Sequence, residues 1–144
     1  MKRLMIFAVV VTSAFAACKT IKSGAISSEG VSQLSGTWEL DYISGPRIAF
    51  NGLYPAKPPF ISFDISNKKF SGNTSCNSFS GNLDADDSTI NFTAPLMMTK
   101  MACPGEGEAT FIEMLRKVST YSVTNDSTLN FMMGDIAIMR FNKK

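Results

Sequence analysis

The sequence predicts a mainly β protein: a small antiparallel β-barrel-like domain of about eight strands, with one α-helix near residues 105–119 inserted before the last strands. Three observations support this prediction. Short runs of alternating apolar and polar residues recur along the chain, as they do in strands that bury one face. Turn residues separate these runs at the short intervals typical of sandwiches and barrels. One segment alone, around residue 111, has the apolar spacing of a helix.

The N-terminus has the pattern of an export signal. Lys2 and Arg3 precede an apolar run over residues 4–17. This run has the length of a signal-peptide core, but it is too short for a membrane-spanning helix, which needs roughly 20 apolar residues. Residues 1–17 are therefore predicted to be a signal peptide that is removed from the mature protein.

Two cleavage positions fit the end of this segment. Ordinary signal peptidase would cut before Ala17. The favoured interpretation is that residues 15–18 (FAAC) resemble a bacterial lipobox, so that Cys18 is the lipid-attachment residue and acyl chains hold the protein at a membrane. Because Lys19 stands where some inner-membrane lipoproteins carry an acidic retention signal, the predicted location is the outer membrane of the cell envelope. A soluble periplasmic or secreted protein is the alternative.

The mature chain divides into a tether and one domain. Residues 18–33 are rich in Ser, Gly and Lys and lack strand or helix periodicity, so they are predicted to be a flexible tether between the lipid and the domain. Residues 34–144 are long enough to bury a core of their own and are predicted to form one domain.

The first half of this domain is predicted to consist of strands joined by turns. In residues 34–43, Trp38, Leu40 and Tyr42 alternate with polar residues, which predicts a strand with these three side chains on its buried face. Residues 44–59 contain four prolines and are predicted to be an ordered excursion or loop. Further strands are predicted, in order, at residues 60–65, 70–73, 77–83, 89–93 and near 97–101.

The helix is predicted from the spacing of Phe111, Leu115 and Val118, which marks one apolar face. Pro104 suits a first helical position. Three strands then follow, at residues 121–123, 128–132 and 136–141, and the alternation in the last one puts Ile136, Ile138 and Arg140 on the same face.

The composition excludes several chemistries. The chain has no His, the commonest general acid–base group and the commonest transition-metal ligand, so Ser-His-Asp and Cys-His catalysis are ruled out. Lys and Arg number 14 against 12 Asp and Glu, and two of the basic residues lie in the signal peptide, so no basic surface for nucleic acid is indicated. We therefore expect a protein that is not an enzyme and that has no cofactor, metal site or nucleic-acid partner.

The methionines allow two interpretations. Met97, Met98 and Met101 are soft thioethers that could bind Cu(I), but core packing is the favoured role for these and for the other methionines of the domain. The acidic turn at residues 84–87 lacks the spacing of an EF-hand loop and is interpreted as a solvated hairpin turn.

Two blocks of sequence resemble the META (HslJ-like) domain family. Residues 70–81 (FSGNTSCNSFSG) resemble its F-x-G-x-x-G-C-N-x-F-x-G signature, with Ser75 at a position where Gly is commoner. Residues 99–103 (TKMAC) resemble its T-x-M-A-C signature, and residues 34–38 (LSGTW) resemble the usual opening of the domain. The resemblance covers about residues 34–142 and implies a small β-barrel-like envelope domain with one helix and no settled activity.

Cys76 and Cys103 are predicted to form a disulfide. Both belong to the exported domain, and an oxidising compartment favours disulfides. Because Cys18 is accounted for by lipidation, the odd number of cysteines resolves into one modified residue and one pair. Buried free thiols and redox or metal chemistry remain the alternatives.

The polar residues around Cys76 allow two roles. Asn73, Asn77 and Ser78 either satisfy the backbone groups of a turn or line a recognition surface. The second role is the hypothesis for function: a non-catalytic, lipid-anchored envelope module that binds a protein or another envelope component, with the resemblance implying a part in stress tolerance. The alternative is a lipocalin-like barrel that encloses a small apolar ligand.

Overall fold

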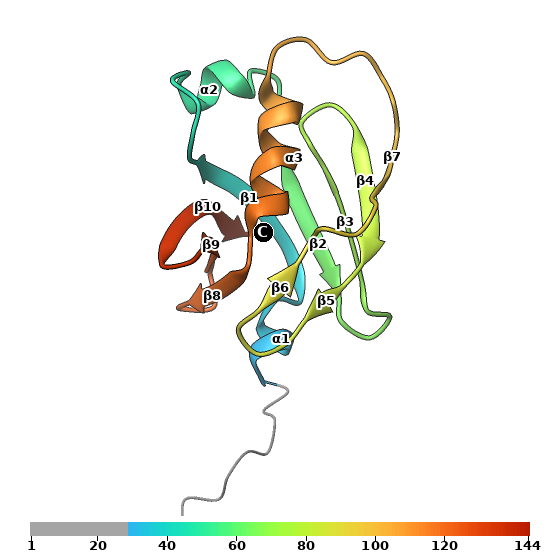
Figure 1. Cartoon of the computed structure of the whole chain (residues 1–144), viewed down its shortest axis with the longest axis vertical. Coiled ribbons are helices and arrows are strands. Elements are labelled where there is room, and N and C mark those ends of the chain that lie inside the picture. The colour runs from blue at the N-terminus through green and yellow to red at the C-terminus, as the bar shows by residue number, and fades with distance from the viewer. Residues whose placement is uncertain (1–28) are drawn as a thin grey trace, which may run out of the picture.

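Eight strands form one antiparallel sheet (Figure 1). The computed structural model describes residues 29–144, so the predicted signal peptide and Cys18 lie outside the described residues. From one edge of the sheet to the other the strands are β7 (Met97–Met98), β4 (Ser78–Asn82), β3 (Lys69–Asn73), β2 (Phe60–Asp64), β1 (Gly36–Ile43), β10 (Ile136–Lys143), β9 (Thr128–Met133) and β8 (Thr120–Thr124).

The mainly β, antiparallel architecture with one long helix before the last strands is confirmed, but the sheet is not closed into a barrel. Its edge strands, β7 and β8, do not pair with each other. A ribbon of β5 (Asp84–Ala85) and β6 (Ile90–Asn91) lies between β4 and β7 in the chain order and reaches β8 through an isolated bridge between Thr89 and Thr120. The Tyr121 N–H also donates to the Ser88 carbonyl at 2.9 Å. The ribbon therefore contacts β8 through isolated hydrogen bonds and does not join the eight-stranded sheet.

The long helix, α3 (Gly107–Lys117), runs across the front of the sheet in Figure 1. The face predicted from the sequence is the one that it buries, since Phe111 and Leu115 are fully buried and Val118 is 5% exposed. Pro104 is not its first residue, because Gly105, with a φ of 73°, turns the chain before the helix starts.

Two short helices were not predicted. α1 (Glu29–Gln33) occupies the last five residues of the predicted flexible tether, and its Gly30 lies so close to Asp87 that a Cβ there would be 2.5 Å from the Asp87 carbonyl oxygen. α2 (Phe50–Leu53) lies in the proline-rich segment, where Tyr54, directly after it, donates its hydroxyl to the Gly107 carbonyl at 3.1 Å. Both helices therefore pack against the domain.

Aromatic rings fill the space between the sheet and α3. Neighbouring ring centroids are 5.0 to 6.5 Å apart. The hollow beside Phe70 and Phe92 holds only about 10 Å³. A lipocalin-like cavity would need roughly 300 Å³ or more at this place. At this place the interior of the described domain is therefore filled by aromatic rings. The rings belong to Phe63, Phe70, Phe79, Phe92, Phe111, Phe131 and Phe141.

Two β-bulges change the predicted faces of the strands. In β1 the register against β10 shifts between Leu40 and Tyr42, so Tyr42 is 44% exposed while Ile43 is buried. In β10 a shift between Ala137 and Met139 leaves Ile136 64% exposed, although Ile138 is buried. The predictions that Tyr42 shares the buried face of Trp38, and that Ile136 and Ile138 share one face, are therefore wrong, because each bulge inserts a residue and reverses the alternation.

Core packing accounts for only some of the methionines. Met139 is fully buried, but Met97, Met101 and Met133 are 68%, 60% and 46% exposed. The prediction of a general core role is wrong for these three. Met97 and Met101 also line different surface hollows, which does not support a shared Cu(I) site.

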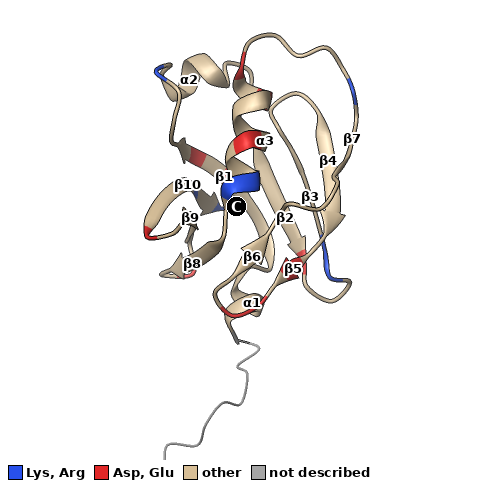
Figure 2. Ribbon diagram, in the orientation of Figure 1, with Lys and Arg blue, Asp and Glu red and all other residues tan. Residues whose placement is uncertain are grey.

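The described residues include no helix that is both long and apolar enough to cross a membrane. Acidic and basic residues are interspersed along the ribbon, without a long run of either sign (Figure 2).

Candidate functional site

The β3–β4 hairpin is the centre of the candidate site. Its turn, residues 74–77, is closed by the Thr74 N–H, which donates to the Asn77 carbonyl at 2.8 Å. Ser75 adopts a φ of 84°, in the left-handed region that favours glycine. This explains in physical terms why Gly is the commoner residue at this place in the resembling family pattern.

The turn is tied to the segment before α3 by the predicted cysteine pair. Cys76 and Cys103 form a disulfide with Cα atoms 5.9 Å apart and a sequence separation of 27 residues. A cross-link over such a loop stabilises a domain by about 3–4 kcal/mol in the chain-entropy model. The two family-like blocks of sequence therefore meet at one end of the sheet.

Asn77 is the hydrogen-bonding hub of this end. Its Oδ1 accepts hydrogen bonds from the Thr99 hydroxyl and from the Met101 N–H, each at 2.8 Å. Its Nδ2 donates to the Met101 carbonyl at 3.0 Å and to Glu108 Oε1 at 3.1 Å, and it lies 3.0 Å from Cys103 Sγ. Because Asn77 is only 1% exposed, it holds the turn, the 99–103 segment and α3 together and cannot contact a partner.

Glu108, in the first turn of α3, was not singled out in the sequence. The Thr74 hydroxyl donates to its Oε2 at 2.6 Å, and Asn77 donates to its other oxygen. No Lys or Arg of the described chain forms an ion pair with it. Beside it a cleft of about 310 Å³ opens to solvent, with Tyr54, Met101 and the disulfide among its walls.

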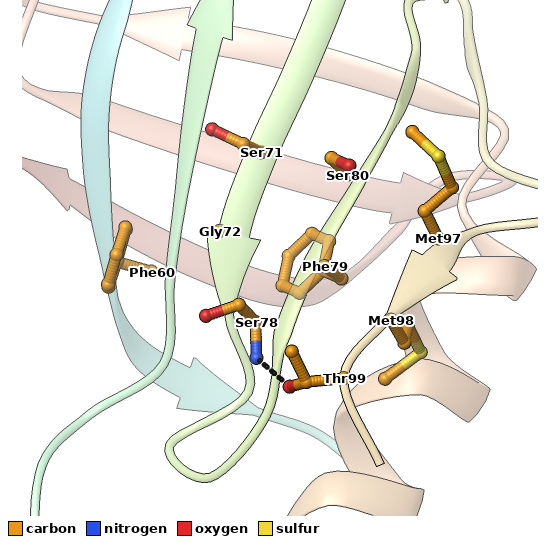
Figure 3. A pocket seen from close by; sticks show the side chains of 9 residues that line it. All are labelled: Phe60, Ser71, Gly72, Ser78, Phe79, Ser80, Met97, Met98 and Thr99. Carbon is orange, nitrogen blue, oxygen red and sulfur yellow. Dashed lines mark hydrogen bonds between the residues drawn. The ribbon is translucent and has the colours of Figure 1, made fainter.

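A second hollow, a furrow of about 510 Å³, lies on the outer face of the sheet (Figure 3). We define the furrow by Phe60 at one side, Ser71, Ser78 and Ser80 along its floor, and Met97 at the other side. In Figure 3, Ser71, Ser80 and Met97 lie in a row across β3, β4 and β7, and the pairing puts Ser71 opposite Ser80 and Ser80 opposite Met97. No charged residue lines the furrow.

A repeated tetrapeptide, which the strand pattern alone did not indicate, builds the floor of the furrow. Residues 70–73 and residues 79–82 both read FSGN and pair antiparallel, so that each Phe lies opposite the Gly of the other copy. A Cβ on Gly72 would be 2.5 Å from the Phe79 ring, and one on Gly81 would be 2.8 Å from the Phe70 ring. The rings thus occupy the inner face, and Ser71 and Ser80 lie on the outer face, in the floor of the furrow.

The predicted recognition residues do not all reach the surface. Ser78 is exposed and lines the furrow, where the Thr99 hydroxyl accepts a hydrogen bond from its N–H at 3.0 Å (Figure 3). Asn73 is 7% exposed, and its Nδ2 donates to the Ser78 hydroxyl at 3.5 Å. Of the three residues, Ser78 is thus accessible, whereas Asn73 and Asn77 are buried.

Two tyrosines among the described residues have raised pKa values. The two shifted tyrosines are explained by structure: burial raises the pKa of Tyr54 above its usual range. Burial, with the charges of Asp87 and Asp86, raises the pKa of Tyr121 to about 12. The Tyr121 hydroxyl donates to the Asp86 carbonyl at 2.6 Å and thus fastens the β5–β6 turn to β8.

The fold and this disulfide-linked end define a small β domain in which one helix covers an open antiparallel sheet. The chain belongs to the META domain family, whose model matches residues 32–144. The family and the structural relatives point to no known family of enzymes.

Two solved structures have a similar fold. A DUF4847 family protein from Bacteroides vulgatus has a TM-score of 0.53 and 20% identity, over 77% of this chain and 94% of that chain. A protein from Burkholderia xenovorans, solved by NMR, has a TM-score of 0.61 and 15% identity, over 92% of this chain and 98% of that chain. At these identities the likeness shows the fold alone. No curated protein matches the chain.

Proposed function

We propose that this protein is a non-catalytic binding module of the bacterial cell envelope, held to the membrane through a lipid on Cys18, and that it binds a partner protein at the furrow. The observation that carries the proposal is the furrow itself: a hollow of about 510 Å³ on the outer face, beside the sheet edge β7. Since aromatic rings fill the interior, binding at the surface is the mode that the geometry favours.

The chemistry of the furrow indicates the kind of partner. Its walls are the apolar side chains of Phe60 and Met97, and its floor offers serine hydroxyls and no charge. Met97 is 68% exposed, and a flexible thioether at a surface adapts to an apolar partner side chain. β7 has no strand on its outer side, so an extended protein segment could add there and place alternate side chains over the furrow.

Photo-cross-linking tests the furrow. A photoreactive residue at position 80 should give one discrete product in intact envelopes, whereas the same residue at position 127, in the exposed β8–β9 turn, should not. Ser71→Arg should abolish that product, because a long charged side chain would fill the furrow. Ser127→Arg should leave it unchanged, and both variants should melt within about 2 °C of the wild type. Equal products from positions 80 and 127, or a product that survives Ser71→Arg, would contradict the proposal.

The anchor is tested separately. In a bacterial host the protein should incorporate labelled fatty acid, and Cys18→Ser should release it from the membrane fraction. An unlabelled mature protein that begins at Ala17 would exclude the lipid anchor but would leave the furrow untouched.

A further inference from the structure

The disulfide and Glu108 bring three potential metal ligands together beside the cleft. The sulfur atoms of Cys76 and Cys103 and a carboxylate oxygen of Glu108 all lie within 4.8 Å of one another, and no other group of three His, Cys, Asp or Glu side chains in residues 29–144 is placed to hold one ion. In the oxidised protein the sulfurs are bonded to each other, so neither is available as a thiolate. We propose that reduction of this disulfide converts the cluster into a site for Zn²⁺, with Cys76, Cys103 and Glu108 as ligands and water as the fourth.

The geometry needs only small side-chain movements. Zn²⁺ binds thiolates at about 2.3 Å in a tetrahedral arrangement, so its two sulfurs must lie about 3.8 Å apart. The Cα atoms of the two cysteines are 5.9 Å apart, and once the sulfur–sulfur bond is reduced, rotation about the Cα–Cβ bonds can bring the sulfurs to that separation. Catalytic zinc sites commonly use three protein ligands and a water, and carboxylate oxygen is an accepted ligand beside thiolates.

Neighbouring groups already orient the ligands. Glu108 is fixed by Thr74 at 2.6 Å and by Asn77 at 3.1 Å, which are neutral donors that leave its negative charge uncompensated. The same Asn77 amide lies 3.0 Å from Cys103 Sγ and can support a thiolate there. Such hydrogen bonds from an outer shell position the ligands of metal sites. After reduction, two thiolates and a carboxylate would repel each other, and a divalent cation would remove that repulsion.

The site is also accessible. Both cysteines are half-buried, and they line the cleft of about 310 Å³ together with Glu108. A dithiol that enters the cleft would attack one sulfur, transfer two electrons and two protons to the pair, and leave as its own disulfide. Binding of Zn²⁺ then releases the two thiol protons, and zinc keeps its oxidation state. In the reverse exchange, the disulfide form of the dithiol would take two electrons and two protons from the metal-free thiols, restore the Cys76–Cys103 disulfide and close the site.

A metal titration tests the proposal on the full mature chain. The protein is reduced with a dithiol, freed of it by desalting without oxygen, and titrated with Zn²⁺ against a chromophoric chelator. We expect one equivalent to bind to the reduced protein at least about 100-fold more tightly than to the oxidised protein, because two thiolate ligands are lost in the disulfide. Cd²⁺ should give thiolate charge-transfer absorption with the reduced protein only.

Matched variants identify the ligands. Glu108→Gln should weaken zinc binding by roughly 10- to 100-fold, whereas Glu106→Gln, two residues earlier and exposed, should not change it. Replacing both cysteines with Ser gives a chain that cannot form the disulfide, and it should bind no more tightly than the oxidised protein. Circular dichroism shows whether the reduced chain is folded. Equal binding by oxidised and reduced protein, unchanged binding by Glu108→Gln, or a reduced chain that is unfolded and that zinc does not refold would each overturn the proposal.

Discussion

Replacement of Asn77 with Ala should destabilise the domain more than its place beside a turn suggests. The change removes an amide that is 1% exposed and bonded to Thr99, Met101 and Glu108. A lost hydrogen bond costs about 1 kcal/mol net, and a buried group left without a partner costs about 1–3 kcal/mol. Because the Met101 backbone and Glu108 could recover some bonds with water, we expect a total loss of about 3 kcal/mol in the free energy of unfolding.

Urea unfolding with the disulfide intact measures this loss, and for a domain of this size it corresponds to a decrease of about 12 °C in Tm. Asn82→Ala is the matched control, since Asn82 is an exposed residue of β4, the strand that directly follows Asn77, and its replacement should change stability by less than about 0.5 kcal/mol. A loss below about 1 kcal/mol for Asn77→Ala, or equal losses for the two variants, would refute the hub role of Asn77.

Three further predictions follow from the backbone and from one shifted pKa. Ser75→Gly should stabilise the domain by about 1 kcal/mol, because φ is 84° there, and unchanged or lower stability in urea unfolding would contradict the strain argument. Gly72→Ala should cost about 2–3 kcal/mol, since its Cβ would be 2.2 Å from the Phe60 carbonyl oxygen, and Gly81→Ala, which meets only side chains, should cost less. The folded-state pKa of Tyr121 is raised to about 12 from 10.0, so the stability that it contributes is complete below pH 10 and lost as pH rises toward 12. In urea unfolding between pH 10 and pH 12, the free energy of unfolding of Tyr121→Phe should decrease less than that of the wild type. Equal decreases for the two proteins would show that the raised Tyr121 pKa does not contribute to stability.

The periodicity of the sequence located most elements but could not reveal the bulges. The extra residue in β1 is Asp41, whose carboxylate accepts a hydrogen bond from Arg140 Nε at 3.0 Å, across the pair with β10. Nothing within residues 36–43 records that pairing, because it depends on a strand about a hundred residues later. Period-two alternation therefore assigned Tyr42 to the core, whereas the bulge turns it outward and Ile43 inward.

For a similar reason, only part of the candidate site could be predicted from the sequence. The two cysteines could be paired by counting, and the structure joins them. The roles of Asn73 and Asn77 could not be read from their polarity, because a buried amide such as that of Asn77, which contacts four other residues, and an exposed amide look the same in a sequence. Glu108 had no signal at all, since an acidic residue in the first turn of a helix is expected for the helix dipole alone.

In the repeated FSGN segment, core packing constrains the Phe and Gly residues but not the Ser residues. On the inner face of the sheet, the rings of Phe70 and Phe79 fill the space that side chains at positions 81 and 72 would occupy. Packing therefore constrains all four residues. Outside, Ser71 and Ser80 form a cross-strand pair for which the structure shows no packing demand, and longer polar residues would fit a solvated face equally well. Long side chains at these two positions would cover the furrow. Because small hydroxyls occupy both, the outer face stays open beside the exposed Met97, as the proposed binding of a partner at the furrow requires.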